Sequence, residues 1–261
     1  MLMLTHTWIL RTFLASTPSQ NIAPDIFVHN ISPDILPVHK DITTDMTHGV
    51  ERFIRPPAEH SKAALAQFHL FVDDIAHHGT ICRGSAINFN PHSEGYTYRK
   101  GRLLIEPIIA FHRSIGQQLS FNEASYRSHI LIEMAFDQAL QDGEAKQEAA
   151  LLFFDALNYT VENKLEDFCR TSSWLYGISE GIIAEAIRQG KEKYTLERAD
   201  LFSASSGRVA LYTGKFGLDY NDTRSGVENL LDRGMDMVTD YGDFLTFTLK
   251  TIRETGFTCP L

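Results

Sequence analysis

The segment from Gln67 to His78 constrains the fold of this chain most strongly, because it combines helical periodicity with ionisable groups in an apolar pattern. His69, Asp73 and His77 are spaced four residues apart, so their side chains lie along one face of a helix. Burial of such groups is costly unless a partner neutralises them. Two imidazoles and a carboxylate suit a Zn, Fe or Mn ion. The alternative is that both histidines hydrogen-bond Asp73 on a half-exposed face.

Helical patterns recur along most of the chain and predict an all-α fold. We expect an irregular multi-helix bundle that forms one domain over residues 1–261, with a metal-site half at 1–141 and C-terminal helices at 142–261. The predicted helices cover 6–15, 58–78, 102–115 with a break or kink near Pro107, 120–141, 144–158, 160–169, 174–190, 195–204 and 224–254.

The segments between these helices have distinct compositions. Five prolines between residues 20 and 57 predict loops with short helical pieces. Residues 80–100 are rich in Asn, Gly, Ser and Tyr, and predict either a loop that covers a functional site or a plain solvated loop. A Gly-rich turn is expected at 213–221, and 207–213 is the one segment whose pattern also fits a strand.

Composition excludes several classes of protein. The net charge is −9, from 24 basic and 33 acidic residues without a Lys/Arg block, which argues against stable nucleic-acid binding. The three scattered cysteines indicate a reducing compartment rather than a disulfide framework. No apolar stretch is long enough to span a membrane, and the first residues lack the basic region of a signal peptide. We therefore expect a cytoplasmic protein; whether it forms a homo-oligomer stays open.

A second predicted helix carries a similar polar stripe. His129 and Glu133 are four residues apart, Asp137 follows one turn later, and apolar residues surround all three. An HxxxE pattern alone is a weak motif, but two such helices in one chain are more than chance usually provides. The two stripes together predict one shared site.

The N-terminal third adds three candidate ligands. His6 opens the first predicted helix, Asp34 follows Pro33 among apolar residues, and His48 precedes a glycine that would allow close approach. Each residue alone is more often structural. Together with the two helical stripes, they supply enough ligands for two or three metal ions.

In this order the motifs resemble those of the zinc-dependent phospholipase C family and the related single-strand-specific nucleases, whose fold is helical and which include uncharacterised cytoplasmic members. The resemblance covers roughly the first 140 residues. The matching motifs are His-Thr-Trp-Ile at 6–9, Pro-Asp at 33–34, Thr-His-Gly at 47–49, His69-xxx-Asp73 and His129-xxx-Glu133.

The resemblance implies a ligand set for each metal ion. One ion would be held by Asp34, His48, His69 and Asp73, and Asp73 would bridge to a neighbouring ion that is also bound by His6. The remaining ion would be held by the other stripe, namely His77, His129 and Glu133.

Two departures from the family leave alternatives open. In the secreted phospholipases a processed N-terminal tryptophan helps to bind a metal, whereas this sequence starts with Met only five residues before His6, so the number of metals is two or three. The spacing of Asp73 and His77 is also shorter than in those enzymes. His78 therefore stays an alternative to His77, and His39 an alternative to His48.

These residues predict a metal-dependent phosphoric ester hydrolase that acts on a small phosphorylated or phospholipid-headgroup substrate. Zn is the expected ion, with Fe or Mn as alternatives, and two metals would lower the pKa of water and stabilise phosphate charge. The predicted catalytic carboxylates are Asp34, Asp73 and Asp74. Asp34 or Asp74 would act as general base, and Asp74 could instead orient a ligating imidazole or be a solvated helix residue.

Three other interpretations remain. The first is a phosphohydrolase similar to the HD type or to the acyl-carrier-protein phosphodiesterases, although the chain has no adjacent His-Asp pair. The second is a di-iron carboxylate bundle, which would need Glu-xx-His repeats that are not visible. The third is a non-catalytic helical binding protein.

Overall fold

The computed structural model describes residues 2–15, 22–84, 90–143, 145, 148–195 and 205–260. Over these ranges the chain forms helices and no strand, which confirms the predicted all-α multi-helix bundle. The helices of the first half are α1 (Met3–Ala15), α2 (Asp25–Asn30), α3 (Ser32–Ile35), η1 (Leu36–Val38), α4 (Thr44–His48), η2 (Ala58–His60), α5 (Ala63–His78), α6 (Tyr96–Gly101), η3 (Arg102–Leu104), α7 (Ile105–Ser114) and α8 (Phe121–Asp142). Those of the second half are α9 (Glu148–Asn163), α10 (Leu165–Tyr176), α11 (Glu180–Lys193), α13 (Ser205–Phe216), α14 (Tyr220–Met237) and α15 (Tyr241–Glu254).

The central helix α5 is buried along nearly its whole length. It ends because Gly79 adopts a left-handed conformation with φ of 78° and its N–H bonds the carbonyl of Ile75. The predicted helix over 58–78 is therefore a 3₁₀ turn followed by α5. The other site-bearing helix, α8, begins with a capping box in which Ser120 and Glu123 satisfy each other's backbone N–H groups.

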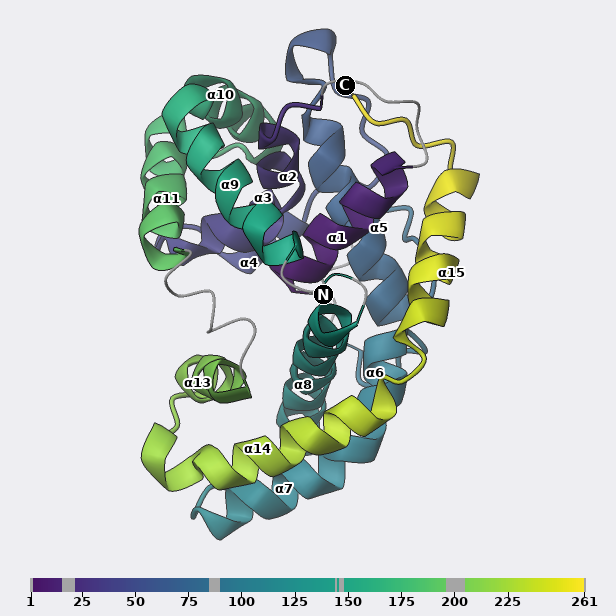
Figure 1. Cartoon of the computed structure of the whole chain (residues 1–261), viewed down its shortest axis with the longest axis vertical. Coiled ribbons are helices and arrows are strands. Elements are labelled where there is room, and N and C mark those ends of the chain that lie inside the picture. Colours follow the sequence, from purple (N-terminus) through teal and green to yellow (C-terminus); the bar gives the residue numbers. More distant parts are fainter. Residues whose placement is uncertain are drawn as a thin grey trace.

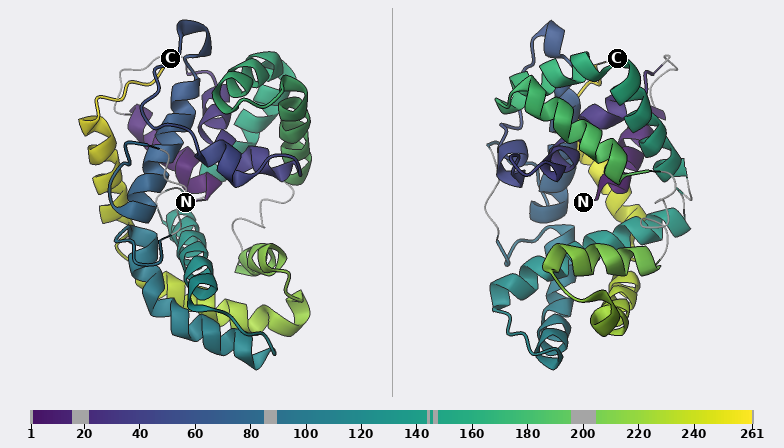
Figure 2. Two further views of the ribbon diagram at one scale, coloured as in Figure 1. Left: turned by 180° about the vertical axis from the view of Figure 1, so that it is seen from behind. Right: turned by 90° about the vertical axis from the view of Figure 1, so that its left-hand side faces the viewer.

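The remaining helices surround these two (Figure 1). α1 crosses α5 near the middle of the molecule, where α4 and one end of α8 also lie. α9 packs on α1 and α2, and α10 and α11 pack on each other beside them. α15 runs along α5, while α14 packs on α8 and α13 at the end of the molecule opposite α10 (Figures 1 and 2).

The helices predicted at 160–169 and 174–190 each cross a helix boundary, since α9 ends at Asn163 and α10 at Tyr176. Three further predicted elements differ from the structure. Residues 207–213 belong to α13 rather than to a strand, because Arg208, Val209 and Tyr212 share the buried face of a helix. The helix predicted over 224–254 is interrupted between α14 and α15, where Asp240 accepts hydrogen bonds from Tyr96 and Lys100 of α6. This break contains neither Gly nor Pro, so contacts with a distant helix determine it.

The third difference concerns the helix predicted over 102–115. Its break lies between η3 and α7, before Pro107. Pro107 occupies the first turn of α7, where a missing N–H costs no hydrogen bond. The helix predicted at 195–204 lies outside the described residues apart from its first position. No described helix has the length and apolar character needed to cross a membrane.

Candidate metal centre

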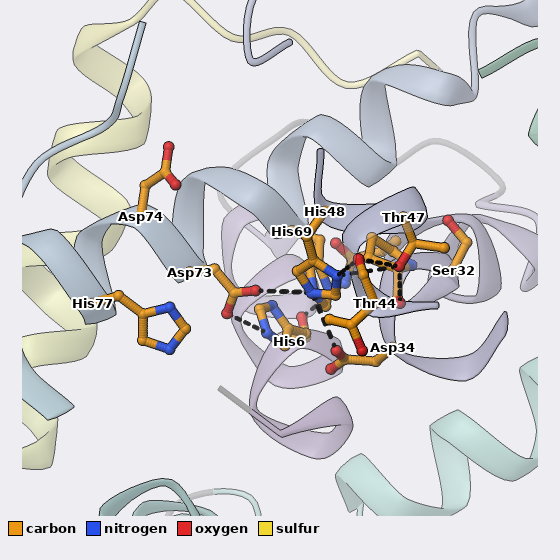
Figure 3. A network of polar contacts seen from close by, with 12 residues as sticks. His6, Ser32, Asp34, Thr44, Thr47, His48, His69, Asp73, Asp74 and His77 are labelled. Atoms are coloured by element: carbon orange, nitrogen blue, oxygen red, sulfur yellow. Dashed lines mark hydrogen bonds and ion pairs between the residues drawn. The ribbon is translucent and has the colours of Figure 1, made fainter. Parts of the chain in front are cut away.

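Five of the predicted ligands come together from four helices (Figure 3). They are supplied by α1, α3, α4 and α5, and we call them the first cluster: His6, Asp34, His48, His69 and Asp73. The first cluster contains two sets of three residues that share His69. In each set the ligand atoms lie within 4.8 Å of one another. These sets are His6 with His69 and Asp73, and Asp34 with His48 and His69.

Asp73 lies between the imidazoles, and its two oxygens face different rings. Oδ1 is 3.2 Å from Nε2 of His6, whereas Oδ2 is 3.3 Å from Nε2 of His69 and 3.5 Å from Nε2 of His48. Since its two oxygens face different imidazoles, Asp73 would suit the role of a ligand shared by two metal ions.

The rings of His6 and His69 are buried and suited to bind a metal ion as neutral imidazoles. They stack with centroids 3.5 Å apart, and burial together with the neighbouring His69 lowers the pKa of His6 to about 4. All four ring nitrogens are buried and lack a hydrogen bond of acceptable geometry among the described residues. Each such group costs about 1–3 kcal/mol if it is left unsatisfied, and coordination to a metal would remove that cost for one nitrogen of each ring. The residues present therefore fit a metal ion.

His48 completes the first cluster at its more exposed edge. Its Nε2 is 3.5 Å from Oδ1 of Asp34. Burial disfavours its charged form, but hydrogen bonds to Asp34 and Asp73 outweigh burial and raise the pKa of His48 to about 10. Without a metal, His48 is therefore protonated at neutral pH, and its positive charge offsets one of the two carboxylate charges at this edge. A metal ion would replace that proton.

The short helices are tied together by hydrogen bonds that position His48. The Thr47 hydroxyl donates to the carbonyl of Pro33, which joins α4 to α3. Arg52 donates to the carbonyl of His48 and pairs with Asp74 through two hydrogen bonds, 2.9 and 3.0 Å long. Arg52 was not singled out in the sequence, because a basic residue in a Pro-rich segment gives no signal of burial.

The other stripe forms a second cluster, which consists of His77, His129 and Glu133. Nε2 of His77 is 2.8 Å from Oε1 of Glu133. The ring of His129 lies between two tyrosines, stacked on Tyr98 at 4.6 Å and edge-on to Tyr126 at 4.9 Å. Burial lowers the pKa of His129 to about 3, so this imidazole is neutral and can donate a lone pair. Since His77 follows Asp73 by one helical turn, both clusters lie along the same face of α5.

The structure also separates the alternatives that the sequence left open. His77 faces the second cluster, whereas His78 lies with Asp74 and Cys82. His48 belongs to the first cluster, whereas His39 contacts Asp41 and Glu185. The predicted stripe residue Asp137 takes part in neither cluster, because it accepts hydrogen bonds from the backbone and hydroxyl of Thr5.

Asp74 does not join either cluster, which corrects its predicted catalytic role. In Figure 3 it points away from the converging side chains, because adjacent helical residues project in different directions. Both of its oxygens bond Arg52, and one also accepts the N–H of Cys82. Asp74 therefore holds the Arg52 segment and, through it, the backbone of His48.

Comparison of this chain with known protein families, curated proteins and solved structures found no match. Any inference about function therefore rests on the described residues alone. They include His, Asp and Glu groups that could hold a metal ion, and three of these groups make up the two clusters described above.

Proposed function

We propose that this chain is a metal-dependent hydrolase of phosphoesters with a His/Asp/Glu cluster of two or three ions. Zn is favoured and Fe or Mn is compatible, because the donor set consists of imidazoles and carboxylates. The position of Asp73 carries the proposal, since its two oxygens face separate imidazole groups at 3.2 and 3.3 Å. A pair of metals so bridged suits the displacement of a group at phosphorus.

The first cluster would hold two of the ions through His6, Asp34, His48, His69 and Asp73. The second cluster would hold the remaining ion through His77, His129 and Glu133. When bound, the metals supply Lewis acidity, which polarises phosphate oxygens and lowers the pKa of water.

The chain's own groups complete the site. The side chain of Asp34 is 23% exposed, so it is accessible at the edge of the first cluster. Burial raises the pKa of this carboxyl, but His69 and the hydrogen bond from His48 lower it further, so Asp34 is ionised. An accessible carboxylate here can accept a proton from water. The Tyr98 ring covers one face of His129 and restricts the approach of solvent.

Metal content tests the proposal directly. Elemental analysis of protein purified without a His tag should find two to three equivalents of Zn, Fe or Mn. A His69→Ala/Asp73→Ala variant should lose the metals of the first cluster, since it removes the shared imidazole and the bridging carboxylate. His39→Ala is the matched control, because it removes a buried histidine outside both clusters. Circular dichroism establishes that each variant is folded.

Activity is the second requirement. The metal-loaded protein should hydrolyse bis(4-nitrophenyl) phosphate or a phospholipid headgroup ester, and the double variant should not. A wild-type protein that stays metal-free after incubation with Zn, Fe and Mn would refute the hydrolase and favour a non-catalytic binding protein. A protein that binds metal but cleaves no phosphoester would retain the metal centre and refute the reaction.

A further inference from the structure

An open surface cavity of about 520 Å³ lies between α8 and α13. Its walls combine two aromatic rings with two cations, supplied in equal parts by the two helices. The aromatic residues are Tyr126 and Phe216, and the cations are Arg127 and Lys215. Asn122 and Glu123 complete the lining.

The cavity adjoins the second cluster along one face of α8, with the Tyr126 ring between them. Tyr126, His129 and Glu133 are spaced three and four residues apart, so their side chains lie in one row. The Tyr126 ring lines the cavity and also contacts the His129 ring, with centroids 4.9 Å apart. From Glu133 to Tyr126 the helix rises about 10 Å, which is the length of a phosphate group followed by one aromatic ring.

The two cations are positioned by rings. The Arg127 guanidinium lies 4.4 Å from the Phe216 centroid and 3.0 Å from Nε2 of His112. Nζ of Lys215 lies 5.8 Å from the centroid of Tyr126. Neither cation forms an ion pair with a carboxylate in the described part of the chain. Lys215, which is exposed, is thus available to an anion, and Arg127 adds positive charge to the same wall while its guanidinium also contacts Tyr212.

The one acid of the cavity has another role. Glu123 accepts hydrogen bonds from the backbone N–H and the hydroxyl of Ser120 in the capping box of α8. The lining therefore has a positive balance, in a chain whose net charge is −9. The local positive charge of this wall attracts an anion, although the molecule as a whole is negatively charged.

We propose that this cavity binds the leaving group of the phosphoester substrate, and that this leaving group has a planar ring and a second negative charge. The ring lies against Tyr126 and Phe216, and the charge is bound by Lys215 and Arg127. This inference rests on the proposed function, because the scissile phosphate would lie at the proposed metal centre with its leaving oxygen toward the second cluster. In the reaction, the bond from phosphorus to the leaving oxygen breaks, water supplies the oxygen that replaces it, and the leaving oxygen takes a proton.

A pair of substrates tests the charge preference. Methyl phenyl phosphate and methyl 4-carboxyphenyl phosphate differ in one carboxylate on the leaving ring. In the wild-type protein kcat/KM for the carboxylated ester should exceed that for the phenyl ester by about fivefold, a ratio that allows for the solvent exposure of Lys215. Lys215→Gln should reduce this ratio, mainly through KM, and leave the part that Arg127 contributes. The matched control Lys250→Gln, at an exposed position on α15, should keep the wild-type ratio.

Direct binding separates this inference from the proposed function. The probe is 4-carboxyphenylphosphonate, which cannot be hydrolysed at oxygen, and its binding is measured by calorimetry. Lys215→Gln should weaken this binding by about fivefold. Hydrolysis of both esters at equal efficiency would overturn the inference and leave the proposed function standing. If neither ester is cleaved but the phosphonate binds in a Lys215-dependent way, the cavity assignment stands and the hydrolase fails. Absence of phosphonate binding overturns the inference.

Discussion

The buried ion pair between Arg52 and Asp74 yields the sharpest prediction. Each side chain is 2% exposed, and the pair forms two hydrogen bonds of 2.9 and 3.0 Å. Asp74→Asn keeps the shape but removes the charge, so the guanidinium stays buried without a counterion. The loss of one partner of a buried pair costs about 3–5 kcal/mol of unfolding free energy. Asp155→Asn, at an exposed position on α9, should cost less than about 0.5 kcal/mol.

Urea unfolding followed by circular dichroism measures this cost. With a denaturant slope of about 3 kcal/mol per molar, the Asp74→Asn midpoint should fall by about 1–1.7 M. The double variant Arg52→Met/Asp74→Leu should recover part of the loss, because apolar residues remove the uncompensated charge. It should not recover all of it, since the carbonyls of His48 and Val50 lose their donor.

Metal content of the folded Asp74→Asn protein decides between a structural and a functional role. The structure predicts wild-type metal content, because Asp74 belongs to neither cluster. A wild-type unfolding midpoint combined with lost metal or activity would refute this reasoning and restore Asp74 to the site.

Three further predictions concern the surroundings of the clusters. Gly95→Ala should lower the free energy of unfolding by roughly 1–3 kcal/mol, because the added Cβ would lie 2.0 Å from the carbonyl carbon of His77. Gly84→Ala is the control, since its added Cβ meets open space, and thermal unfolding measures both variants. Lys62→Met should destabilise the protein at pH 7, and less so as the pH falls below 3.8. Burial raises the pKa of Asp167 but Lys62 lowers it further, so their pairing stabilises the fold above that pH and is lost on protonation. A chelator should lower the wild-type melting temperature by about 5–10 °C and lower that of the His69→Ala/Asp73→Ala variant by less, because this variant keeps only the ion of the second cluster.

Much of the architecture is encoded by neighbouring residues. The apolar period of 58–78 and the capping box at Ser120 specify α5 and α8, because helix formation and capping depend on residues within one or two turns. The spacing of His69, Asp73 and His77 also places these groups on one face wherever the helix packs. The all-α fold and the two polar stripes could therefore be predicted from the sequence.

The tertiary structure decided which polar groups meet. Asp73 and Asp74 are adjacent and chemically alike, but α1 and α4 bring their imidazoles to the face of α5 that carries Asp73, whereas Arg52 pairs with Asp74 on another face. The interruption between α14 and α15 has no local signal and depends on α6. Local periodicity thus determines the helices and the direction of each side chain around its own axis. Contacts between residues far apart in the chain determine which faces converge, and therefore where a metal can bind.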